Sequence, residues 1–164
     1  MHTLTYPLTT HGQVMKYAEN IAEEYLLHVP GDERQNRFCK TFDDLQSLNR
    51  NGIVLCVTAH PLRYDGEYDN VHRIMRYEWL LMQSIGTDLS KAEQAIEECT
   101  ELHDKILTRL AYDSDPLRLT NRVFTYFRWN EITTDIYDEP RYTDGMVGIS
   151  SVVPLGSNKS FIFN

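Results

Sequence analysis

Residues 79–107 read WLLMQSIGTDLSKAEQAIEECTELHDKIL, and this stretch decides the fold class. Its first part is a run of apolar residues, whereas its second part repeats apolar residues at the spacing of an amphipathic helix. Ser90 and Glu93 have the spacing of a capping box, which predicts that the helix begins there. A strand that leads directly into a capped helix is typical of a domain that contains both a sheet and helices.

The helix predicted after Ser90 has one apolar stripe and one acidic face. The stripe consists of Ala92, Ala95, Ile96, Cys99, Leu102, Ile106, Leu107 and Leu110. Glu93, Glu97 and Glu101 lie off this stripe, and we expect them to form an exposed acidic helix face. The helix should stop before residues 113–116, because their proline disfavours helical backbone angles in the residue ahead of it.

The segment Val71–Ile85, at the start of this region, fits two patterns. Read as a strand, it places Tyr77 and Trp79 on one face; read as a helix, it lines up Trp79 with Met75 and Met82. We favour a long strand, because an Asp-Gly turn signal precedes the segment and no clean polar helical face is present.

The N-terminal part of the chain predicts a second amphipathic helix over residues 11–28, capped by Thr9 or Thr10. Residues 31–50 are polar and mixed, and we expect an insertion or an irregular connection there, with a short helix over Asp43–Leu48. After this segment comes a β-branched run that predicts a buried strand, Ile53–Val57. The His-Pro pair at residues 60–61 should end or bend that strand.

The C-terminal part predicts further strands. Val123–Ile132 is rich in aromatic and β-branched residues and predicts a strand that Thr133–Tyr137 could extend, up to a break at Glu139-Pro140. A second strand is predicted over Met146–Val153 and should stop at the proline that follows it. Phe161–Phe163 would add a short last strand.

These elements predict an α+β fold. We expect a mostly antiparallel sheet with two main helices packed on one face, in the order helix-strand-strand-helix-strand-strand. The 164 residues contain no repeat, linker or low-complexity segment, so residues 1–164 are expected to form a single domain.

The net charge of −8 and the pI near 5.2 argue against a protein that binds nucleic acid or anionic membranes, since such proteins need a basic face. Cys39, Cys56 and Cys99 contain no CxxC pair, and we expect buried free thiols in a reducing compartment. The first ten residues do not resemble a signal peptide, and no apolar run approaches membrane-spanning length. The expected location is the bacterial or host cytoplasm.

No sequence motif names a reaction. The six histidines lack the spacing of a metal site, so no catalytic residue, metal or cofactor is predicted. His60 and His72 are the candidates that an enzyme would use, His72 together with the acidic group Asp65, Glu67 and Asp69. A packed or solvated loop explains His60 better, and a solvated hairpin tip explains the acidic group better than a calcium loop does.

The order and size of the elements resemble the tail terminator or tail-completion proteins of phages and the related cap proteins of contractile injection systems. The local matches are the strand and capped helix of residues 79–107 and the late sequence YTDGMVGISSVVP at residues 142–154. The resemblance implies a ring, usually a hexamer, that terminates the tail tube and joins it to the head or neck. It implies neither catalysis nor a cofactor.

If the resemblance holds, the partners are further copies of the chain and tail tube, sheath or neck proteins, and the ring is assembled into a virion or tail-like particle. An acidic lumen formed by the helix face would repel passing DNA without binding it specifically. Residues 143–164 contain only two charged residues, which predicts a strand edge that a neighbouring subunit or the domain's own core must cover. The predicted subunit interface consists of Met146, Val147, Ile149, Val152, Val153, Phe161 and Phe163.

Two other functions compete with the structural ring. A protein–protein adaptor or assembly factor without ring symmetry would use the same surfaces. A small enzyme of unrecognised type would use one of the two candidate histidines with nearby acids.

Overall fold

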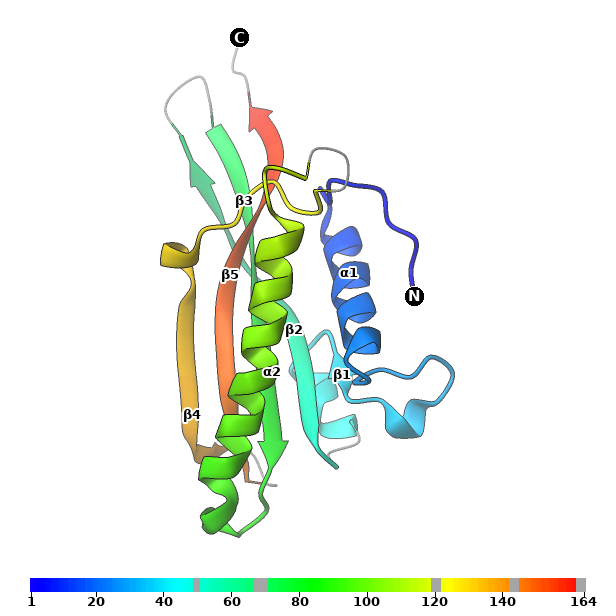
Figure 1. The fold of residues 1–164 in the computed structure, drawn as a ribbon, viewed down its shortest axis with the longest axis vertical. Helices are drawn as coiled ribbons and strands as arrows, with labels where there is room; N and C mark the ends of the chain where they lie inside the picture. The colour runs from blue at the N-terminus through cyan, green and yellow to red at the C-terminus, as the bar shows by residue number, and fades with distance from the viewer. Residues whose placement is uncertain (49–50, 67–70, 119–121, 142–144, 162–164) are drawn as a thin grey trace.

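The computed structural model describes residues 1–48, 51–66, 71–118, 122–141 and 145–161. The helices and strands in chain order are α1 (His11–Glu24), η1 (Glu33–Gln35), β1 (Phe38–Cys39), η2 (Asp43–Ser47), β2 (Ile53–Asp65), β3 (Val71–Ser84), η3 (Leu89–Lys91), α2 (Ala92–Asp113), η4 (Trp129–Glu131), β4 (Thr133–Arg141) and β5 (Met146–Phe161). The strands form one sheet in the order β1-β2-β3-β5-β4, and α1 and α2 cover one face of it (Figure 1). The predicted α+β class is confirmed.

The sheet is antiparallel except at one edge. β2 pairs with β3, β3 with β5 and β5 with β4 in antiparallel register, whereas the two-residue strand β1 runs parallel to β2. Leu81 in the central strand lies opposite Leu55 on one side and Ile149 on the other. The prediction that Val71–Ile85 is a strand is confirmed, and both faces of β3 carry buried apolar side chains, which explains why no polar face is visible in its sequence.

The main core lies between the sheet and the two helices. Tyr77, Trp79 and Leu81 of β3 face it, and helix α1 contributes buried apolar residues at helical spacing, including Val14 and Ile21. Helix α1 ends four residues earlier than predicted. The reason is that Leu26 takes a left-handed backbone angle, with φ of 57°, and turns the chain back toward the helix end.

The starts of the two helices are capped differently from each other. Thr10 caps α1 through a capping box with Gln13, as expected from its position. The capping box predicted from Ser90 and Glu93 is wrong, because Asp88 caps a preceding 3-10 turn by accepting a hydrogen bond from the Ser90 backbone N–H. Helix α2 continues that turn and begins at Ala92 without a side-chain cap of its own.

The second face of the sheet is covered only in part. Leu45 of η2 packs on a smaller apolar cluster that includes Cys56, Leu80 and Met82. The short helix predicted over Asp43–Leu48 is present as the 3-10 helix η2. Because Leu45 packs on the sheet, η2 attaches the region 31–48 to this face.

The prediction of a strand over Val123–Ile132 is wrong. The described part of this segment is an ordered, irregular strap, in which the Val123 N–H donates to the Asp113 carbonyl and Phe124 packs edge-on against Tyr17. The aromatic side chains of the strap are used for packing on the core, and the strand β4 begins only at Thr133.

Three strands run through prolines. Those in β4 and β5 were expected to end their strands, and the one in β2 was expected to end or bend its strand. β2 continues past Pro61 with a register shift, β4 continues past Pro140, and β5 continues through Pro154 to Phe161. Pro61 and Pro140 lie inside register shifts, and Pro154 has a described partner strand on one side only. Bulges and unpaired strand sides are the places in a sheet where proline is tolerated.

Candidate functional site

The predicted subunit interface on the C-terminal strand lies in the interior of the sheet. Met146, Val147, Ile149 and Val153 are buried, because β5 has β3 on one side and β4 on the other and its inner face packs on the core. The prediction that these four side chains form a subunit interface is wrong, because the domain itself covers them, which was the alternative left open. Val152 is half-buried, the side chain of Phe161 is not described, and Phe163 lies outside the described residues.

The predicted acidic helix face is exposed. Glu93, Glu97 and Glu101 all face solvent on α2, and the buried side of that helix is the apolar stripe with His103 added to it.

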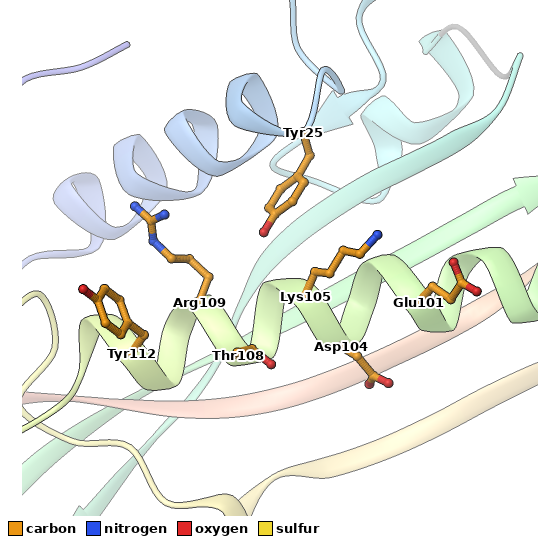
Figure 2. Close-up of a pocket in the computed structure, with 7 residues that line it drawn as sticks. All are labelled: Tyr25, Glu101, Asp104, Lys105, Thr108, Arg109 and Tyr112. Carbon is orange, nitrogen blue, oxygen red and sulfur yellow. The ribbon is translucent and has the colours of Figure 1, made fainter.

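Glu101 also lines a groove of about 640 Å³ between the two helices (Figure 2). The groove is lined by Tyr25, Glu101, Asp104, Lys105, Thr108, Arg109 and Tyr112. Tyr25 from the end of α1 and Arg109 from α2 point into the space between the helices. Charges of both signs line this groove, since Glu101 and Asp104 are acidic and Lys105 and Arg109 are basic.

Arg109, which lines the groove, also donates a hydrogen bond to a buried carboxylate. Asp113 is 4% exposed and accepts hydrogen bonds from the Tyr17 hydroxyl at 2.6 Å, from Arg109 Nε at 2.8 Å and from Arg118 Nη1 at 2.9 Å. Burial, together with the Asp113 charge, raises the pKa of Tyr17 well above its usual value, so the phenol stays a donor. These bonds tie α1, α2 and the segment after α2 together, which is a structural role.

A second polar chain resembles a catalytic triad in its order of residues. His103 Nε2 lies 2.8 Å from the Ser151 hydroxyl, and its Nδ1 lies 3.6 Å from an Asp104 carboxylate oxygen. Ser151 is fully buried and is also bonded to the Thr134 hydroxyl, so no substrate carbonyl can reach its oxygen. The hydrogen-bonded side chains of His103, Ser151 and Thr134 instead link α2 to β5 and β4.

The histidines singled out from the sequence do not converge on one site. His60 Nε2 lies 3.2 Å from a Glu78 carboxylate oxygen on the sheet face that the helices leave open. The side chain of His72 is not described, and Glu67 and Asp69 lie outside the described residues.

Among the described residues, Glu19, Glu23 and His28 come close enough to suggest a cation site. Glu19 already contacts Lys40 at 2.6 Å and His2 at 3.0 Å, and these contacts lower its pKa against the opposing effect of burial. The cluster is thus an ion-pair network of the protein itself.

The second cavity of the molecule was missed by sequence reasoning. It measures about 410 Å³ and is lined by Thr9, Thr10, His11, Ala59, Leu62, Arg73, Met75, Arg76 and Tyr77. His11 stacks on Tyr77 with ring centroids 5.8 Å apart, and His11 Nδ1 lies 3.2 Å from the Tyr77 hydroxyl. The lining residues come from three separate parts of the chain, so no local spacing could have indicated them.

No protein-family model matches the chain, and no curated protein matches it either. Within the described ranges, no helix combines the length and the apolar character needed to cross a membrane.

Proposed function

We propose that the protein is a structural, ring-forming protein that caps a phage-tail-like tube and joins it to the head or neck. The observation that carries the proposal is that the sheet has two unlike open edges on opposite sides (Figure 1). An open strand edge offers unpaired N–H and C=O groups to a neighbouring chain, and two unlike edges allow a head-to-tail contact that closes into a ring.

The first open edge is the outer side of β4. Eight of its nine residues are exposed, and Ile136 is 59% exposed although it is a large apolar residue. Asp135, Asp138 and Glu139 make this edge acidic, and charges on an edge strand disfavour indiscriminate pairing. The edge therefore suits one specific neighbour.

The second open edge is the outer side of β2. Among the described strands, only β1 pairs there, and it reaches only Leu55 and Cys56. Beyond that point β2 continues past the ends of both helices, and Leu62 on this part is 47% exposed (Figure 1). The proposed ring contact therefore joins the β4 edge of one copy to the β2 edge of the next, and the buried residues of β5 take no part in it.

Light scattering on the purified chain at several micromolar concentrations tests the proposal. We expect a closed oligomer of hexamer size, or one that forms as the concentration rises, and Ile136→Asp should shift it toward the 19.2 kDa monomer. Leu89→Asp is the matched control, because Leu89 is 67% exposed on η3 and belongs to neither edge. A strict monomer at every concentration that also fails to bind tail tube protein would exclude the ring, and a stable one-to-one complex with another protein would favour an adaptor.

A further inference from the structure

We propose that Cys39 and Cys56 are an oxidation site, at which hydrogen peroxide converts two buried thiols into a disulfide. This inference does not depend on the ring proposal. All three cysteines of the chain are buried free thiols, so the structure is that of the reduced pair. The main support is that two of the three lie directly opposite each other on neighbouring strands.

The pairing of β1 with β2 places these two side chains next to each other. Cys39 and Cys56 are register partners in the parallel ladder, and both belong to the small apolar cluster on the sheet face that η2 covers. Neighbouring strands of a sheet lie about 4.8 Å apart. A disulfide joins residues whose Cα atoms are roughly 4.4–6.8 Å apart. The bond therefore needs only a small movement of the backbone.

The two thiols contact each other and differ in their access to solvent. A hydrogen bond with the Cys39 side chain, together with burial, raises the pKa of the Cys56 thiol above its usual value. Cys56 is 1% exposed, whereas Cys39 lines a surface cavity of about 380 Å³. A small oxidant that enters this cavity therefore reacts with Cys39 first, and Cys56 is the thiol that completes the bond.

The oxidation takes place in two steps. The Cys39 sulfur attacks one oxygen of hydrogen peroxide, the O–O bond breaks, and a sulfenic acid and one water form. The Cys56 sulfur then attacks the sulfur of the sulfenic acid, the S–O bond breaks, and the leaving hydroxide takes the Cys56 proton to form a second water. The two thiols together lose two electrons and two protons, and the peroxide takes them up. A dithiol reductant reverses the reaction by thiol–disulfide exchange.

The disulfide fixes β1 on the sheet. This strand has only two residues, and among the described strands it pairs with β2 alone. The bond closes a loop over residues 40–55, which include η2, and so restricts the unfolded chain. The oxidised protein should therefore melt roughly 5–10 °C higher than the reduced protein.

The test counts the cysteines that iodoacetamide alkylates in the denatured protein, before and after the folded protein is treated with hydrogen peroxide. We expect all three cysteines to be alkylated before oxidation, only Cys99 after it, and all three again after dithiothreitol. Mass spectrometry of a digest should show Cys39 and Cys56 joined. Cys99→Ala is the matched control and should still form the bond, because Cys99 lies on α2 in the main core between the sheet and the helices.

The unaltered protein gives the decisive result, so a variant that fails to fold does not affect it. Three alkylated cysteines after peroxide treatment would overturn the proposal, and so would a bond to Cys99, cross-linked dimers alone, or higher oxidation of Cys39 without a bond. The order of the two steps is tested in Cys56→Ser, where dimedone should trap a sulfenic acid at Cys39. A melting temperature that falls on oxidation would contradict a bond that fits the fold.

Discussion

At the scale of single residues, the buried polar groups determine how the layers of the molecule are joined. His103 and Asp113 lie on the buried side of α2, and each is hydrogen-bonded to another element of the fold. Neither was predicted as a core residue, because a histidine or an aspartate at the edge of an apolar stripe has the same appearance in a sequence whether it is solvated or buried. The apolar stripe itself was predictable from spacing alone.

Asp113→Asn should lower the free energy of unfolding by ~2–3 kcal/mol. Removing one partner of a buried ion pair is strongly destabilising, although Arg109 and Arg118 can each reach solvent and so recover part of the loss. Urea unfolding measures the change. Glu97→Gln removes the same charge from the exposed face of the same helix and should change stability by less than ~0.5 kcal/mol. Equal effects of the two substitutions would show that the hydrogen bonds of Asp113 do not stabilise the fold.

His103 should make the stability of the fold depend on pH. Burial lowers its pKa in the folded protein, against a smaller opposing effect of Asp104, so the unfolded chain takes up a proton at the higher pH. Stability conferred by the neutral ring is therefore complete above the unfolded value of about 6.5 and is lost as the pH falls below it.

The measurement is urea unfolding of the wild type and of His103→Gln at pH 5.5 and pH 7.5. The stability difference between the two proteins should be larger at pH 7.5, because only the wild type gains stability as its histidine loses the proton. A difference that is the same at both pH values would contradict a neutral, buried His103.

At the scale of secondary structure, close contact between β3 and β5 depends on a glycine. A Cβ at residue 148 would collide with the carbonyl oxygen of Leu81 and with the Cα of Met82 on the neighbouring strand. Gly148→Ala must therefore push the two strands apart, and we expect a loss of ~3 kcal/mol or more.

Gly12→Ala is the matched control for this substitution. Nothing lies within 4 Å of a Cβ at residue 12, and alanine is a better helix former than glycine, so this variant should be as stable as the wild type or up to ~1 kcal/mol more stable. Thermal unfolding of both variants provides the comparison, and similar melting temperatures would mean that the strands tolerate separation.

The same scale explains which elements could be predicted. α2 and β3 were predictable, because each has a long pattern of one period. The strap at residues 122–128 was not, because aromatic residues that pack on Tyr17 have the same composition as those of a strand. Proline positions were misleading for a related reason, since whether a strand tolerates proline depends on its neighbours in the sheet, which the local sequence does not contain.

At the scale of the whole molecule, the fold class was predictable and the position of each strand in the sheet was not. The low charge of residues 143–164 indicated that something covers this segment, and for residues 146–156 the domain itself provides that cover. A strand with so few charges is equally compatible with a subunit contact and with an interior position. The cavity with Arg73 and Arg76 was beyond prediction, because its other wall comes from residues more than 60 positions earlier in the chain.

The interior position of β5 has a consequence for synthesis on the ribosome. β5 is the last described strand along the chain, yet it pairs with β3 and β4 on its two sides. Until residues up to about 161 have emerged from the exit tunnel, β3 has only β2 as a partner and the core face of α2 lacks the cover that β5 provides. The sheet therefore cannot be completed before β5 has been synthesised, and until then the apolar segments that β5 covers are exposed to binding by chaperones.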